Sequence, residues 1–397
     1  MRVRSRGSLA VLSLSTFVFV TAESLPIGLL VPISRGLDVS QGAVGLLVTG
    51  YAAVVVVATI PLTRVTRRVP RKLLLAVLLG VFIVGTALCA ASGTYVALLV
   101  FRLVVAVAQA LFWAVVSPAA ASVVDEAAQG RAVAIVNAGS ALGPVLGVPL
   151  GTLVGQLAGW RTAFLLLAAV GMVVLVGILV LLPNERAGEG RAERGMQPDR
   201  TRFISTVLVT GLAVTGAYTA FTFVTPFLNT VTGLPPSADG ALLLLRGVAG
   251  FAGAVVVGLV IDRAPWGTVF AIVVLQTAAF AVQWAAGTEA VAAVAAIALA
   301  GLTLSALASA NGARILRYAP GDTAAASAAV STAFNIGIML GALTGSITEA
   351  NAGLAAVPLL GTVITLVAVA TISGERLLTC RRRSSNEDER QVLASQG

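Results

Sequence analysis

The sequence predicts an all-α integral membrane protein with twelve transmembrane helices in two pseudo-symmetric six-helix bundles. Of its 397 residues, 58% are hydrophobic and 11% are charged, whereas soluble proteins carry roughly a quarter charged residues. Uncharged apolar runs long enough to cross a hydrocarbon layer of ~30 Å recur along the whole chain. Runs such as residues 73–91 are apolar on every side, which favours helices over the alternating strands of a membrane barrel.

The apolar runs define six predicted spans in each half of the chain. The first six cover 9–33, 43–63, 72–92, 95–118, 131–155 and 162–183. The second six cover 203–229, 239–261, 268–286, 290–312, 323–347 and 352–373. The first run extends past Glu23 to about Ile33, which is longer than the apolar core of a signal peptide, so we interpret it as a span.

A polar segment divides the two sets of spans. Gly, Glu and Arg dominate it and apolar residues nearly vanish, which is typical of a flexible linker. We therefore expect an N-terminal bundle over 1–183, a cytoplasmic linker over 184–202 and a C-terminal bundle over 203–373. The polar residues 374–397 are expected to form a disordered cytoplasmic tail.

Basic residues indicate the orientation of the spans. The formal charge is +9, but most Lys and Arg lie in the tails and in the loops of one side, while the opposite loops hold only Arg35 and Arg161. Cytoplasmic loops collect Lys and Arg. The pattern predicts a multi-pass protein of the cytoplasmic (inner) membrane with both termini in the cytoplasm. It favours contact of the basic residues with lipid and water over a nucleic-acid partner.

The sequence lacks the residues that several kinds of catalytic and metal-binding site require. The chain has no histidine and a single lysine, Lys72, in a loop, which removes histidine triads, His-bound zinc and the P-loop lysine. No G-x-S-x-G motif and no pair of carboxylates inside a predicted span is present. Cys89 and Cys380 fall at opposite sides of the membrane and cannot pair. We expect no enzyme activity, no metal and no cofactor, and an ion gradient as the energy source.

Glu23 is the one acidic residue deep inside a predicted span. A charge at the bilayer centre costs ~2.5–3.5 kcal/mol on insertion scales, so such a residue is expected to serve function, although a neutral structural Glu is the alternative. Burial favours the protonated form and a nearby Arg favours the carboxylate, which suits proton coupling. Arg102, in the fourth span, is the expected partner. It shares a helix face with Gln109 and Trp113, although an Arg that reaches the outer interface is also possible.

Further polar side chains in the spans are candidates for substrate binding. The seventh span places Tyr218, Thr222 and Asn229 on one face, with Phe221 nearby. Asn137 and Asn335 are single amides in the fifth and eleventh spans. Hydrogen bonds between helices explain each amide as well as ligand contact does. The candidate substrate-binding set is therefore Gln109, Trp113, Asn137, Tyr218, Phe221, Thr222, Asn229 and Asn335. Arg246, in the eighth span, is a weaker functional candidate, because it lies about two turns from the outer end of its span and snorkelling to the interface explains it equally well.

Glycines recur four residues apart in the fifth span, at Gly139, Gly143 and Gly147, and in the eleventh, at Gly337, Gly341 and Gly345. Small residues at this spacing let helices approach closely. The stretch GSALGPVLGVPLG resembles the antiporter signature G-x-x-x-G-P-x-x-G of the twelve-span drug/proton antiporters of the major facilitator superfamily. It matches that signature at Gly139, Gly143, Pro144 and Gly147.

Other stretches carry the same resemblance. FRLVVAVAQALFWAV resembles the fourth-span motif built on an Arg, and GWRTAF resembles the entry to the sixth span. TAESLPIGLLVPIS resembles the first span of the sugar-efflux branch at Glu23, Pro26 and Gly28. Sugar exporters of this type tend to carry a His where this chain has Gln109.

The resemblance also implies a cytoplasmic gate. The family's loop after the second span reads G-x-x-x-D-R-x-G-R-K. Here TRVTRRVPRK puts Arg67 in place of the Asp, while Arg71 is kept. The loop after the eighth span keeps Gly258, Asp262 and Arg263.

These observations predict a proton-coupled exporter in which the two halves rock about a midplane site. Its partners would be protons, membrane lipid and a small molecule such as a drug, a sugar or a nucleoside, and we expect a monomer. A proton-coupled importer on the same fold is the first alternative. A membrane sensor that transports nothing is the second, and the absence of a recognisable soluble domain argues against it.

Overall fold

The computed structural model describes residues 3–66, 69–125, 129–183, 196–261, 263–321 and 323–394. These residues form helices joined by short loops. The first half contains α1 (Val3–Gly28), α2 (Leu30–Leu37), α3 (Gln41–Thr66), α4 (Arg71–Ala91), α5 (Tyr95–Ser122), α6 (Gln129–Leu142), the short π-helix η2 (Gly143–Gly147), α7 (Val148–Ala158) and α8 (Trp160–Leu181). The second half contains α9 (Arg200–Thr222), α10 (Val224–Thr230), the 3₁₀ turn η3 (Pro236–Ala238), α11 (Asp239–Val260), α12 (Pro265–Ala285), α13 (Ala290–Tyr318), α14 (Thr323–Ala352) and α15 (Ala356–Ala394).

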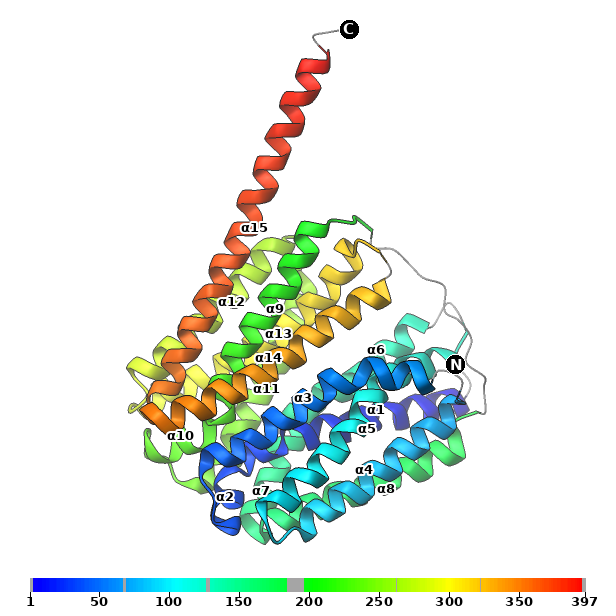
Figure 1. Ribbon diagram of the computed structural model, residues 1–397, viewed down its shortest axis with the longest axis vertical. Helices are drawn as coiled ribbons and strands as arrows, with labels where there is room; N and C mark the ends of the chain where they lie inside the picture. Colours follow the sequence, from blue (N-terminus) through cyan, green and yellow to red (C-terminus); the bar gives the residue numbers. More distant parts are fainter. Residues whose placement is uncertain are drawn as a thin grey trace.

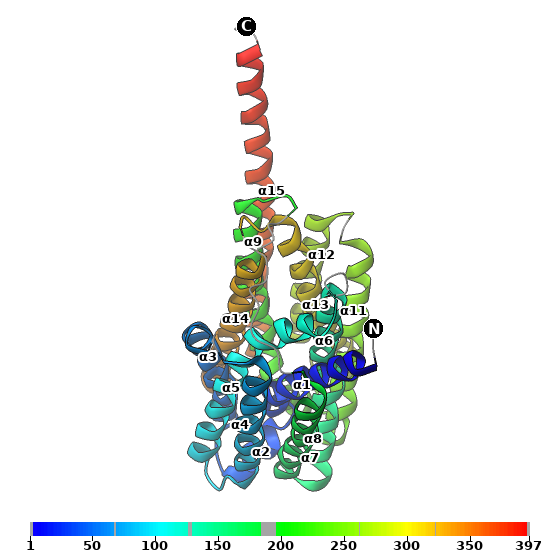
Figure 2. The same ribbon diagram turned by 90° about the vertical axis from the view of Figure 1, so that its right-hand side faces the viewer.

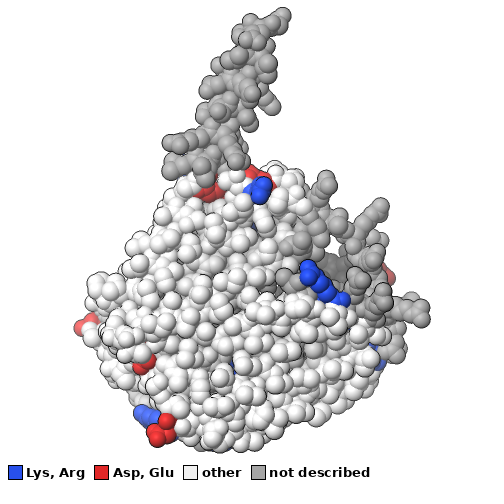
Figure 3. Space-filling model, in the orientation of Figure 1, with Lys and Arg blue, Asp and Glu red and all other residues white. Residues whose placement is uncertain are grey.

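The fold class predicted from the sequence is confirmed. Within the described ranges, 12 helical segments are long and apolar enough to cross a membrane. They form two six-helix bundles, coloured blue to green and green to red in Figure 1. The face drawn in Figure 3 is almost free of charged side chains between its two ends. Large apolar side chains such as Val57, Leu157 and Val291 are exposed, as expected where lipid is the solvent.

The first helix of each half is interrupted toward its C-terminal end, and hydropathy alone does not predict this break. The predicted span 9–33 divides into α1 and α2 at Leu29, and the predicted span 203–229 divides into α9 and α10 at Phe223. The two residues have nearly the same backbone angles, with φ −105° and ψ 13° at Leu29 and φ −109° and ψ 19° at Phe223. The two halves therefore repeat one bend at equivalent places.

The glycine stripes hold this repeated helix in each half. Gly139, Gly143 and Gly147 face α1 so closely that a Cβ on any of them would overlap Ser13, Val20 or Thr21. The corresponding stripe in α14 lies against α9 in the same way, at Gly337, Gly341 and Gly345. The glycine spacing that suggested a duplication therefore marks the same helix crossing in both halves.

The two halves touch at one end of the molecule and diverge at the other (Figure 1). We call the first the contact end; it carries the loops at 38–40 and 353–355. There α3 packs against α14, and α7 and η2 pack against α11. We call the other the terminal end, because α1 and α9 begin there and α15 leaves the bundle there. No helix pair at the terminal end joins the halves extensively in the described residues.

Polar contacts across the contact end are few. The Thr225 hydroxyl donates to the Ile27 carbonyl at 3.3 Å, and the Gln156 amide donates to the Pro236 carbonyl. The carboxylate of Glu349, in α14, interacts with the backbone N–H of Gly42, in the first turn of α3. An anion at a helix N-terminus is stabilised by the unpaired N–H groups there.

The last helix continues into the polar residues that follow the twelfth span. Residues 374–394 were expected to be disordered, but the backbone continues α15 to Ala394, and Figures 1 and 2 both show this helix extending beyond the bundle. No proline or glycine follows Gly374 before Ala394. A helix already nucleated in the span therefore meets no residue that would stop it.

Candidate functional site

Glu23 lies at the end of a chain of buried side chains from three helices of the first half. The Tyr51 hydroxyl, from α3, donates to Gln109 Oε1 at 2.7 Å. The Gln109 amide, from α5, donates to Glu23 Oε2 at 2.7 Å. Glu23, Tyr51 and Gln109 are all buried. The second carboxylate oxygen, Oε1, has no hydrogen-bond partner, so one face of Glu23 is fixed and the other is unsatisfied.

Arg102 contacts the backbone of Glu23 rather than its carboxylate. Its guanidinium donates to the carbonyls of Ala22 at 3.0 Å and of Glu23 at 3.2 Å. It also lies 4.8 Å from the centroid of the Tyr51 ring. The two ion pairs found in the described residues lie elsewhere, at Arg202 and Arg314.

Pro26 explains why Arg102 binds carbonyl groups. Proline has no N–H, so the carbonyl four residues earlier in the helix, that of Ala22, loses its helical donor. A buried carbonyl without a donor is costly. Arg102 supplies the missing donor and so fixes the segment of α1 that carries Glu23.

Sequence reasoning brought Glu23, Arg102 and Gln109 together, and the structure places them in contact. It missed Tyr51. The available signal was that Tyr51 is the one aromatic residue of the second predicted span. Trp113 lies one turn beyond Gln109, is half-buried, and packs edge-on against Phe112 at 5.6 Å between centroids.

The second half contributes an aromatic surface opposite Glu23. Tyr218 interacts with Ser24 and with the charge of Glu23. Its ring packs edge-on against Phe221, with centroids 5.7 Å apart. Thr222 donates to the Tyr218 carbonyl at 2.6 Å, and its methyl group lies toward Gly45. Tyr218 therefore meets α1 where the two halves join.

Other candidates lie away from Glu23 or point elsewhere. The Asn229 amide donates to Asp239 at 3.0 Å, at the contact end. The Asn335 amide donates to the Ser331 carbonyl of its own helix at 3.0 Å. The side chain of Asn137 lies outside the described residues.

The proposed gate residues form no described contact between the halves. Arg67 and Asp262 lie outside the described residues. Arg71 donates to the Pro118 carbonyl at 3.2 Å, within the first half. Gly258 and Arg263 are exposed. The three described positions, Arg71, Gly258 and Arg263, belong to the terminal end, where the halves diverge.

The central part of the stretch that resembles the antiporter signature, Gly143–Gly147, forms η2. On one side Gly143 and Gly147 pack against α1 at Val20 and Thr21. On the other side Pro144 and Val145 pack against Gly247 of α11. This short π-helix therefore sits between the helix that carries Glu23 and the opposite half.

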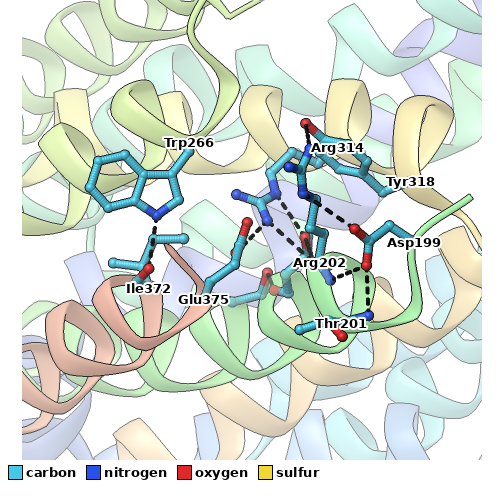
Figure 4. Close-up of polar contacts among 10 residues, drawn as sticks. Asp199, Thr201, Arg202, Trp266, Arg314, Tyr318, Ile372 and Glu375 are labelled. Atoms are coloured by element: carbon cyan, nitrogen blue, oxygen red, sulfur yellow. Dashed lines mark hydrogen bonds and ion pairs between the residues drawn. The ribbon is translucent and has the colours of Figure 1, made fainter. Parts of the chain in front are cut away.

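A second buried charge cluster lies at the terminal end of the second half and was missed (Figure 4). Arg314 and Glu375 form an ion pair of 2.7 Å with both side chains almost fully buried. Arg314 also donates to Thr206 Oγ1 at 2.8 Å, and beside it Arg202 pairs with Asp199 at 3.3 Å. The cluster ties α9, α13 and α15 together.

Comparison with known proteins identifies the family. The family model of the Major Facilitator Superfamily matches residues 12–292. The chain belongs to the major facilitator superfamily. It is therefore a multi-pass membrane protein with a transporter fold, and members of the superfamily carry small molecules.

Solved structures of other transporters share this major facilitator fold. A bacterial homolog of the human lysosomal transporter Spinster, in an inward-facing and unoccupied conformation, is 16% identical with a TM-score of 0.74, over 95% of this chain and 98% of that one. A mutant of the nucleoside transporter NupG is 14% identical with a TM-score of 0.75, over 93% and 99%. The human organic anion transporter MFSD10 is 15% identical with a TM-score of 0.69, over 93% and 99%.

Proposed function

We propose that the chain is a proton-coupled exporter that exchanges a small molecule for protons, with Glu23 as the proton-carrying group. The observation that carries this proposal is the state of Glu23. It is buried, lies where the halves join, and has one unsatisfied carboxylate oxygen. An ionisable residue in such a place is a functional candidate by default.

The surroundings of Glu23 supply a route from protonation to movement. Gln109 and Tyr51 hold one carboxylate oxygen through a chain that crosses α1, α5 and α3. The unsatisfied Oε1 is free to take either a proton or a donor group of the substrate. Because the two compete for one oxygen, substrate binding would release the proton, which is the linkage that exchange requires.

The direction of transport, export rather than import, is proposed from a sequence resemblance. The stretch at η2 resembles the signature of antiporters, and this favours export over import. A proton-coupled importer would use the same residues with the opposite linkage, so that proton and substrate bind together. The neighbouring structures include a nucleoside transporter and an organic anion transporter by their descriptions, and drugs, sugars and nucleosides all stay candidate substrates.

The proposal includes the topology and the assembly. Loops of the terminal end carry most of the Lys and Arg residues, so we assign this end, the linker 184–202 and both termini to the cytoplasm. In this conformation protein atoms enclose Glu23 Oε1, and Glu23 would be reached from outside after the contact end opens. The transporter acts as a monomer, with residues 1–183 and 203–373 as its two moving bodies.

Flux in proteoliposomes with an imposed pH gradient tests the proposal. A panel of radiolabelled pentoses and nucleosides and of fluorescent drugs first identifies a molecule that the wild type moves saturably.

Glu23→Gln keeps the shape and the hydrogen bond with Gln109 but cannot ionise. We expect gradient-driven export to collapse in this variant while counterflow exchange survives. Glu289→Gln, which removes an exposed carboxylate, is the matched control and should behave as wild type. Undiminished gradient-driven flux in Glu23→Gln would remove this residue from the mechanism.

A further inference from the structure

Arg246 is a buried cation without an acceptor. Its residue is 7% exposed and lies about two turns from the start of α11. Across the described chain it forms neither a hydrogen bond nor an ion pair. Its one described contact is with Phe221, whose ring centroid lies 3.6 Å from the guanidinium carbon. The guanidinium nitrogens are not fully enclosed by protein atoms, so they face open space.

The other buried arginines differ from Arg246 in this respect. Arg102 donates to two backbone carbonyls. Arg314 has a carboxylate partner and further acceptors. Burial of a cation is strongly unfavourable unless acceptors replace its water. Arg102 and Arg314 each leave one buried nitrogen without a partner, but among the buried arginines of the described chain Arg246 alone makes no side-chain hydrogen bond at all.

The fold makes room for Arg246 at the junction of the halves. Its side chain passes over Gly301 of α13, where a Cβ would overlap it. The next residue, Gly247, packs against η2 of the other half. Tyr218 interacts electrostatically with both Arg246 and Glu23. The contact of the guanidinium with Phe221 and its interaction with Tyr218 would both be absent if the side chain reached toward the membrane surface, so snorkelling does not fit.

We propose that Arg246 binds an oxyanion of the transported molecule, so that the substrate is a small organic anion with a carboxylate, sulfonate or phosphate on an aromatic or apolar body. Stacking on Phe221 occupies the face of the guanidinium and leaves its in-plane N–H groups free to donate in pairs to such a group. The rings of Phe221 and Tyr218 supply an apolar wall for the body. Arg102 and Arg246 outnumber Glu23, so the junction favours an anion. The inference rests on the proposed function only in treating this junction as the transport site.

Binding of 2-naphthoate and of its neutral amide, 2-naphthamide, to the purified full-length protein in detergent tests the proposal. We expect the wild type to prefer the carboxylate, and Arg246→Gln to weaken its binding by about 10- to 100-fold, the effect of losing a charged hydrogen bond. Arg246→Lys keeps the charge but not the planar pair of donors, so intermediate binding is expected. Arg200→Gln, which removes an exposed arginine of the same half, is the control and should bind as wild type.

Three results would overturn the proposal: equal binding of the acid and the amide, no binding of 2-naphthoate at millimolar concentration, or unchanged binding in a folded Arg246→Gln protein. If Arg246→Gln fails to fold, Arg246→Lys decides the question. The affinity for 2-naphthoate must fall when the planar pair of guanidinium donors is replaced by an ammonium group. Proton release on addition of 6-hydroxy-2-naphthoate, whose hydroxyl supplies a donor for Glu23 Oε1, followed with a pH dye in weak buffer, tests the proposed exchange separately. Binding that depends on Arg246 without proton release supports the anion site and contradicts the exporter.

Discussion

Arg102 and Pro26 both act on the Ala22 carbonyl of α1. Proline leaves the Ala22 carbonyl without its helical donor, and the guanidinium replaces that donor. Sequence reasoning selected Arg102 because a charged residue inside a span is rare. It assigned the guanidinium to the Glu23 carboxylate because opposite charges attract. A helical face cannot reveal a backbone acceptor on another helix, so this contact could be found only in three dimensions.

The pair can be tested by a double-mutant cycle on thermal stability in detergent. Arg102→Ala alone should lower the melting temperature, because two buried carbonyls lose a donor, at about 1–3 kcal/mol for each unsatisfied group. In Pro26→Ala the new N–H can bond to the Ala22 carbonyl. The loss caused by Arg102→Ala should then be smaller, with a coupling of about 1 kcal/mol. Equal losses in both backgrounds would contradict the link between Arg102 and Pro26.

Helices and their crossings were largely predictable, because hydropathy and glycine spacing are properties of single segments. The bends at Leu29 and Phe223 were not, since apolar residues continue through both of them. The pair of Arg314 and Glu375 was also missed. Its members lie 61 residues apart near the ends of two spans, where isolated charges usually face water. A contact between two residues far apart in the chain produces no periodic pattern in the sequence, so pattern reading cannot predict it.

Gly139→Ala and Gly312→Ala compare two glycines inside helices. A Cβ at Gly139 would overlap the Ser13 carbonyl, which belongs to the backbone and cannot yield without moving α1 from α6. A Cβ at Gly312 would meet nothing within 4 Å. We expect Gly139→Ala to lower the melting temperature in detergent. Gly312→Ala should leave it unchanged or raise it, since Ala favours a helix over Gly by about 1 kcal/mol. Similar effects of the two changes would remove the glycine stripe from the packing of α1.

At the scale of the molecule, the halves meet at the contact end and separate at the terminal end. Sequence reasoning predicted the two bundles, because a polar linker and two sets of spans are visible in the chain. It could not predict which end is closed. The surfaces that meet at the contact end are apolar and small-residue faces, and these resemble the faces that pack inside each bundle.

A disulfide across the contact end should trap this conformation. A Cβ built on Gly240 would lie 3.6 Å from the Cβ of Leu153 in the other half, within the usual separation of about 3.5–4.5 Å for a disulfide. In a background without Cys89 and Cys380, oxidation of the Leu153→Cys, Gly240→Cys double variant should stop substrate flux in proteoliposomes, and reductant should restore it. Each single variant is a control that oxidation should not inhibit. Full turnover of the cross-linked protein would show that the contact end need not open.

The contact between Glu349 and Gly42 depends on the side chain of only one of the two residues. The carboxylate belongs to a side chain, whereas its partner is a main-chain N–H that nineteen of the twenty amino acids would supply. A Cβ at position 42 would lie 2.9 Å from the Glu349 oxygen, so the second requirement is only that this position stay small. This contact therefore depends on an acidic side chain at position 349 and a small residue at position 42, and Gly45, one turn further along α3, is restricted in the same way by Ser346 and Phe223.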